Sequence, residues 1–110
     1  MRVPRLSPSD ASPLAVSWFI APEADDGIFV EPLGDEPGWQ VSLAIAESIR
    51  DAEDEVAFAT EVQAQLERVP LVRDVHHEDR EVWLVYGRPP GLLVALAADR
   101  ATRRWRAQAR

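Results

Sequence analysis

Cysteine and lysine are both absent from this chain of 110 residues. Without cysteine there are no disulfide bonds, no thiolate metal ligands and no cysteine nucleophile. Without lysine there is no Schiff-base chemistry and no phosphate-binding loop of the kind that depends on a lysine. All twelve cationic side chains are therefore arginine, a usage that, together with the alanine content, is typical of a GC-rich genome.

Long apolar runs are also missing. No run approaches the roughly 20 residues that a membrane-spanning helix needs. The short apolar stretch 14–21 follows Arg2 and Arg5, but Pro22 and Glu23 stand where a signal peptide would have a small-residue cleavage site. We therefore expect neither a targeting segment nor a transmembrane segment, and we interpret the chain as a cytoplasmic protein.

Positive charge is in deficit, because nineteen acidic residues outnumber twelve arginines and give a net charge of −7. This balance argues against binding along a nucleic-acid backbone. Residues 21–61 hold twelve acids and one arginine, a balance of −11, whereas residues 88–110 hold six arginines and one Asp, a balance of +5. Either the basic segment packs beside the acidic one and neutralises it, or the molecule docks a basic partner through its acidic region.

The length suits a single domain. Prolines and serines alternate in residues 1–13, which predicts a poorly ordered leader before one α+β domain over residues 14–110. Alternating or β-branched residues predict strands at 15–20, 28–30, 39–45, 71–77 and 81–86. The segment 39–47 also has a helical interpretation, and we favour the strand. Residues 82–86 are apolar on both faces, which predicts a central strand.

Two helices are predicted, over residues 48–69 and 92–110. The first has a stripe at three- and four-residue spacing and ends at Pro70, and the stripe consists of Val56, Ala59, Val62, Leu66 and Val69. The second repeats apolar residues every four positions, at Leu93, Ala97, Ala101 and Trp105. We expect a mostly antiparallel sheet of about five strands with both helices on one face, in the order β-β-β-α-β-β-α. From Trp39 onward this order resembles ferredoxin-like folds in topology only, which implies no function.

The sequence His76-His77-Glu78-Asp79 is the only cluster of metal-ligating residue types. Neighbouring residues of a strand point to opposite faces, so His76 and His77 would share an ion only if the backbone turned between them. We interpret both histidines as polar residues beside a turn at 78–80. We expect no bound metal and no cofactor.

Catalytic equipment is not evident. Asp74 and His76 can share one strand face, and Arg73 or Tyr86 can join them across the pair, but no nucleophile elbow or phosphate-binding glycine loop accompanies them. We assign no catalytic residue. The binding candidates are Arg73, His76, Tyr86 and Trp105, and Trp105 is expected to pack on the domain or across a dimer contact.

Two hypotheses for the function follow. The first is a small acidic, non-enzymatic module that binds a protein partner, as an adaptor, inhibitor or immunity-type factor, and forms a homodimer because edge strands need protection. The alternative is a small-molecule-binding protein or enzyme with a pocket between the sheet and the helices, anchored by Arg73, Tyr86 or His76. Neither hypothesis includes a nucleic acid or a membrane as partner.

Overall fold

A computed structural model describes the chain at residues 5–8, 18–21, 27–44 and 49–108. These residues form an antiparallel sheet and two helices, which confirms the α+β class. The elements are β1 (Arg5–Pro8), β2 (Trp18–Ala21), β3 (Ile28–Pro32), β4 (Gly38–Leu43), α1 (Ala52–Glu67), β5 (Val72–Asp79), β6 (Val82–Gly87) and α2 (Gly91–Gln108).

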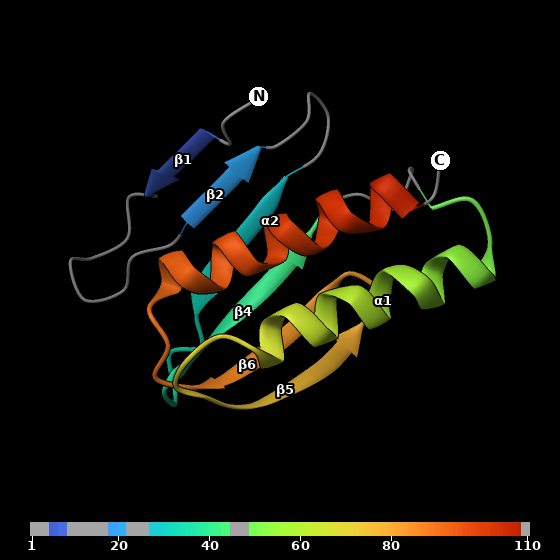
Figure 1. Cartoon of the computed structure of the whole chain (residues 1–110). Helices are drawn as coiled ribbons and strands as arrows, with labels where there is room; N and C mark the ends of the chain where they lie inside the picture. Colours follow the sequence, from blue (N-terminus) through green and yellow to red (C-terminus); the bar gives the residue numbers. More distant parts are fainter. Residues whose placement is uncertain (1–4, 9–17, 22–26, 45–48, 109–110) are drawn as a thin grey trace.

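The strands lie in the order β1-β2-β3-β4-β6-β5, and every neighbouring pair is antiparallel. β6 is therefore an inner strand, as its apolar sequence predicts, and it separates β4 from β5, which run in the same direction and are connected through α1. Both helices cover one face of the sheet (Figure 1). α2 lies over β2, β3 and β4, whereas α1 lies beside α2 and over β5. This arrangement leaves β5 at one edge of the sheet.

The number of strands differs from the prediction of about five. β3 to β6 and the two helices follow the order β-β-α-β-β-α, and the short strands β1 and β2 extend this sheet beyond β3. β1 lies inside the stretch predicted as a leader, and the rest of residues 1–13 lies outside the described residues. Of the strand predicted at 15–20, only residues 18–20 are described, and they belong to β2. Pro8 is acceptable in β1 because an edge strand need not donate every N–H group to a neighbour.

α1 is shorter at its start than the predicted helix. Asp51 caps it by accepting the backbone N–H of Asp54 on its side chain at 2.8 Å, and acidic residues fill the first turn, where the helix dipole favours negative charge. The buried apolar stripe is Phe58, Val62 and Leu66. Val56 was predicted to belong to this stripe, but it is 66% exposed. β4 ends at Leu43, so the strand interpretation of 39–47 is right up to that residue, and residues 45–48 lie outside the described part.

Three aromatic residues form the centre of the core. Phe58 of α1 meets Trp83 of β6 edge-on, with ring centroids 5.8 Å apart, and meets Trp105 of α2 at 5.0 Å. None of the three is more than 3% exposed. The sheet and both helices therefore share one aromatic cluster, in geometries that aromatic pairs prefer.

The start of α2 packs directly on β4. A Cβ atom at Gly91 would lie 2.8 Å from the ring of Trp39, so only glycine fits at this distance. The same ring donates its Nε1–H to the carbonyl oxygen of Pro89 at 2.8 Å. Farther along α2, Ala97 and Ala101 are buried and belong to the core.

The β5–β6 hairpin turns at residues 80–81, and not at 78–80 as the sequence predicts. β5 extends to Asp79 because an irregularity in its pairing with β6, between His77 and Asp79, accommodates an extra residue. His76 and His77 are consequently strand residues rather than turn residues.

Candidate functional site

Two of the four predicted binding residues lie on β5. Arg73 is 72% exposed at its side chain, and its Nη2 atom lies 4.0 Å from Oε1 of Glu36. His76 is 57% exposed, and its Nε2 atom lies 3.1 Å from Oε2 of Glu78. Exposed ion pairs of this kind contribute little to stability. Both side chains are instead available at the surface of the sheet edge.

The structure separates the two aromatic candidates. Tyr86 of β6 is half-buried on the sheet face opposite the helices, directly across from Asp74 of β5. His76 lies on the same face, across from Leu84. Trp105, by contrast, is 3% exposed and belongs to the core. Asp74, His76 and Tyr86 therefore share a face, whereas Trp105 offers no contact surface.

His77 covers Trp83. The two rings are stacked with centroids 4.3 Å apart and planes 3° from parallel, and the residues are directly opposite in the strand register. His76 and His77 thus face opposite sides of the sheet and cannot hold one ion together. In the described part of the chain, no three potential metal ligands gather.

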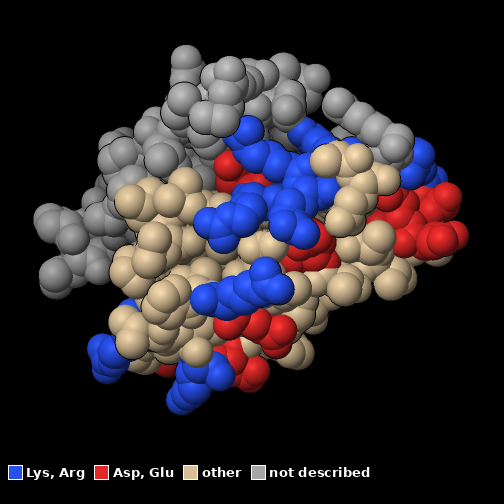
Figure 2. Space-filling view, viewed as in Figure 1, with Lys and Arg blue, Asp and Glu red and all other residues tan. Residues whose placement is uncertain are grey.

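An ion pair and a hydrogen bond, each made by an arginine, connect the two helices. Nε of Arg104 on α2 lies 3.6 Å from Oε1 of Glu61 on α1, and Nη1 of Arg100 donates to Oε1 of Gln65 at 3.4 Å. Figure 2 shows arginine side chains along the helical face of the molecule, with acidic side chains between them. Arg104 of α2 is thus paired with an acidic side chain of α1, which is the kind of contact that the first of the two charge interpretations proposes.

The described residues of the acidic stretch 21–61 do not form one surface. Glu61 is turned toward α2, Glu36 approaches Arg73 on β5, and Glu31 is exposed on β3. Residues 22–26 and 47 lie outside the described residues. The acids of this stretch that the structure describes therefore do not gather into one acidic face.

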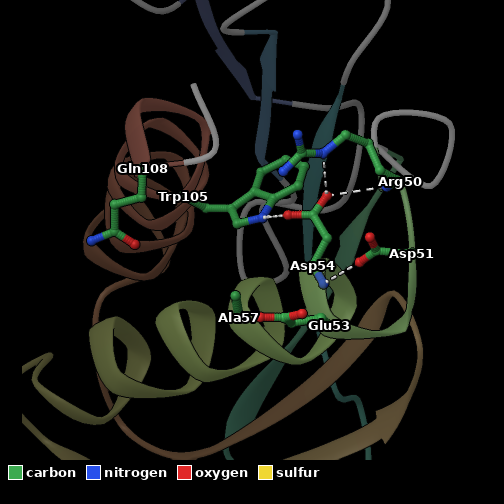
Figure 3. Close-up of a pocket in the computed structure, with 7 residues that line it drawn as sticks. All are labelled: Arg50, Asp51, Glu53, Asp54, Ala57, Trp105 and Gln108. Atoms are coloured by element: carbon green, nitrogen blue, oxygen red, sulfur yellow. Dashed lines mark hydrogen bonds and ion pairs between the residues drawn. The ribbon is translucent and has the colours of Figure 1, made fainter.

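A hollow of about 290 Å³ opens where the start of α1 meets the end of α2. Its lining comprises Arg50, Asp51, Glu53, Asp54, Ala57, Trp105 and Gln108. Figure 3 shows the carboxylate of Asp54 between the indole of Trp105 and the side chain of Arg50. Its Oδ1 accepts the indole N–H at 2.9 Å, and its Oδ2 accepts the backbone N–H of Arg50 at 3.1 Å. Both carboxylate oxygens are thus engaged by the protein itself.

The pKa of Asp54 lies below its usual value. The backbone N–H of Arg50 is the largest cause, and the Trp105 hydrogen bond and the charge of Arg50 lower the pKa further. Desolvation by burial acts in the opposite direction but is outweighed. Because the ionised carboxylate accepts hydrogen bonds from Trp105 and from Arg50, it connects the two helices and does not act as an acid–base group.

The space between the sheet and the helices is filled with side chains. Val41 and Trp83 of the sheet and Phe58, Val62 and Leu66 of α1 are all 0% exposed. A core packed in this way leaves no room among these residues for the ligand pocket that the alternative hypothesis places there.

A groove runs between α1 and the edge strand β5. It has a volume of about 380 Å³ and is lined by Ala59, Thr60, Gln63, Ala64 and Glu67 of α1 and by His77 of β5. Gln63 spans it, because its Nε2 donates to the backbone carbonyl oxygen of Val75 at 3.0 Å. Edge strands carry backbone groups without a strand partner, and here a helix side chain reaches one of them.

The two arginines of the β5–β6 hairpin pair with acidic residues outside β5. Within the described residues, no arginine nitrogen comes within 4.0 Å of a carboxylate oxygen of Asp74, Glu78 or Asp79, although the hairpin carries two arginines. Arg80 instead lies 3.2 Å from Glu55 of α1, and Arg73 is turned toward the β3–β4 loop. The β5 edge therefore keeps a surplus of negative charge.

Comparison with models of known protein families, with curated proteins and with solved structures finds no match to this chain. The candidate site accordingly rests on geometry and charge. No helix in the described ranges has the length and apolarity to cross a membrane.

Sequence reasoning singled out Arg73 and His76, which lie on β5, but missed the groove between β5 and α1. The wall that α1 contributes is made of small and polar residues such as Ala59 and Thr60, which carry no motif. One signal was present: Phe58, Val62 and Leu66 already supply a complete apolar stripe, so Val56 is a surplus apolar residue on another side of α1.

Proposed function

We propose that this protein is a non-enzymatic interaction module that binds a basic segment of a partner protein at the β5 edge. The observation that carries the proposal is an eight-residue edge strand whose acidic side chains have no arginine partner in the described part of the chain. Unpaired edges are where sheets bind other chains, and acidic side chains along such an edge select a cationic segment.

The charge balance supports this choice of partner. The chain carries a net charge of −7, and three arginines of α2 are engaged within the molecule by Glu61, Gln65 and Asp99. The field outside the molecule is therefore negative, which speeds encounters with cationic segments and repels nucleic acid.

No observation favours the small-molecule or enzymatic alternative. Its expected pocket is occupied by core side chains, and its expected anchors Arg73 and His76 lie on the exposed edge strand instead. The buried carboxylate of Asp54 is fully engaged by Trp105 and Arg50.

Homodimer formation stays a prediction, to be measured by sedimentation equilibrium. We do not propose β5 as its interface, because two copies joined there would bring Asp74, Glu78 and Asp79 of both protomers together, and each copy carries −7. Like charges placed opposite each other in a sheet are destabilising.

Fluorescence anisotropy with labelled peptides tests the proposed function. The probe is a nine-residue peptide of alternating arginine and valine, and its counterpart replaces every arginine with glutamate. We expect the protein to bind the basic peptide, more weakly as salt is raised, and not the acidic one. Equal binding of both peptides, or of neither, would overturn the proposal.

Two triple variants locate the site. One carries Asp74→Asn, Glu78→Gln and Asp79→Asn on β5, and its control carries Glu31→Gln, Asp35→Asn and Glu53→Gln at exposed positions elsewhere. Both change the net charge by the same amount. We expect the β5 variant to bind the basic peptide roughly tenfold more weakly and the control to differ little from the native protein. An equal loss in both variants would show an effect of net charge alone and would sink the proposed site.

A further inference from the structure

We infer that the basic segment binds as an added strand, which pairs with β5 and places alternate side chains in the groove beneath α1. This inference rests on the proposed function and specifies how the segment is held. It commits to one occupant, an extended stretch of a partner protein in which basic and apolar residues alternate.

The backbone of β5 is the first observation that supports strand addition. β5 is eight residues long, has β6 on one side only, and ends the strand order of the sheet. The carbonyl oxygen of Val75 accepts a hydrogen bond from the side chain of Gln63, so β5 already accepts a donor from outside the sheet. An incoming strand supplies such donors and acceptors in a row, and its main-chain bonds provide affinity that does not depend on sequence.

The groove between α1 and β5 is the second observation that supports strand addition. Small side chains at Ala59 and Ala64 leave the space of about 380 Å³ beside β5 open. Val56 lies on α1 three and four residues before Ala59 and Thr60, so it is one turn away on the same side of the helix. It exposes 66% of its surface although it is apolar. These neighbours suit apolar side chains of an added strand that point toward the helices.

The opposite face of the sheet is the third observation, because it carries the acidic side chains that would meet the arginines of the segment. Asp74 and Asp79 of β5 stand across from Tyr86 and Val82 of β6, on the face away from the buried Trp83. Successive side chains of a strand point to opposite faces. A segment with valines toward the groove therefore directs its intervening arginines to the face that carries Asp74 and Asp79. This geometry selects the alternating pattern, and charge alone would not.

Backbone methylation distinguishes strand addition from charge attraction. Two further versions of the arginine–valine peptide carry N-methyl groups, either on three valines or on three arginines, so both keep the charge of the parent. In an added strand only one of the two sets directs its N–H groups toward β5. We expect one methylated peptide to bind at least tenfold more weakly than the other. Equal affinities of the two would overturn strand addition, while binding of the parent peptide would leave the proposed function standing.

Substitutions in the groove test where the apolar side chains go. Ala64→Met fills the groove without changing charge, and Ala107→Met makes the same change at an exposed position of α2. We expect Ala64→Met to weaken binding of the parent peptide about fivefold and Ala107→Met to leave it unchanged. Val56→Ser, at a residue outside the core, is the second variant should Ala64→Met fail to fold. Native affinity in a folded Ala64→Met protein and in Val56→Ser would overturn the assignment of the groove.

The competing occupant is a second copy of this chain. Sedimentation of the native protein and of the β5 triple variant, each with and without the parent peptide, separates the two. A monomer that binds one peptide per chain supports the inference. A dimer that excludes the peptide, and that the β5 triple variant strengthens by removing like charges from the shared edge, would overturn it.

Discussion

Asp54, in the first turn of α1, accepts a hydrogen bond from the indole N–H of Trp105, near the end of α2, across 51 positions of sequence and 2.9 Å of space. The start of one helix is thereby fastened to the end of the other. The position also suits the charge, because the N-terminal turn of a helix stabilises a carboxylate. This buried hydrogen bond adds to the packing of Phe58 on Trp105, and together they hold the helix layer that forms one wall of the β5 groove.

This contact predicts a pH dependence. The pKa of Asp54 is lowered in the folded protein. The ionised carboxylate therefore contributes fully to the free energy of unfolding above its unfolded pKa of about 3.9, and this contribution is lost as the pH falls through the folded pKa. We expect Asp54→Asn to have a lower free energy of unfolding than the native protein at about pH 6. The difference in this free energy between the two proteins should be smaller at about pH 3. Urea melts at both pH values measure it. Asp35→Asn, at an exposed position, should follow the native protein, and a constant difference for Asp54→Asn would contradict the prediction.

A second prediction concerns which side of α1 supports the fold. Phe58 is 0% exposed and touches two core tryptophans, whereas Val56 is 66% exposed. We expect Phe58→Ala to lower the free energy of unfolding by about 3–5 kcal/mol, because it leaves a cavity among rigid rings. Val56→Ala should change it by less than about 0.5 kcal/mol. Chemical denaturation measures the free energy of unfolding of both variants. A large decrease for Val56→Ala would mean that α1 buries a different face from the one described.

The same pair of residues shows how far sequence reasoning could reach. Hydrophobic spacing and Pro70 predicted that α1 exists and where it ends. Stripes through Val56 and through Phe58 both satisfy a helical period, so the pattern could not choose between them. The choice depends on Trp83 and Trp105, which reach Phe58 from elements far away in sequence.

The candidate site was predictable only in part for a related reason. The polar sequence of β5 indicated an exposed hairpin and singled out Arg73 and His76. That β5 is an edge depends on β6 pairing with β4, a contact between residues about forty positions apart. No local sequence pattern predicts a pairing between residues so far apart in the chain, so the groove between β5 and α1 could not be predicted. The turn was also misplaced, because the irregularity near Asp79 has no clear sequence signal.

A third prediction separates the two neighbouring histidines. His77 is stacked flat on Trp83, with ring centroids 4.3 Å apart, whereas His76 pairs with Glu78 and is 57% exposed. We expect His77→Ala to destabilise the fold by about 1 kcal/mol, since it uncovers a buried indole. His76→Ala should cost less than about 0.5 kcal/mol. Urea melts that rank the two variants in the reverse order, or equally, would show that the stacked ring contributes nothing.

The fourth prediction concerns the close approach of Gly91 to Trp39. Gly91→Ala would place a methyl group 2.8 Å from the indole, at the first residue of α2, and the indole cannot move freely because its N–H is bonded to Pro89. We expect a loss of about 1–3 kcal/mol from overpacking, although alanine alone would favour the helix. In a Trp39→Phe background the smaller ring makes room, so the same Gly91→Ala change should cost at least about 1 kcal/mol less. Urea melts of the native protein, both single variants and the double variant measure this coupling. Additive losses would mean that the indole does not set the requirement for glycine at this position.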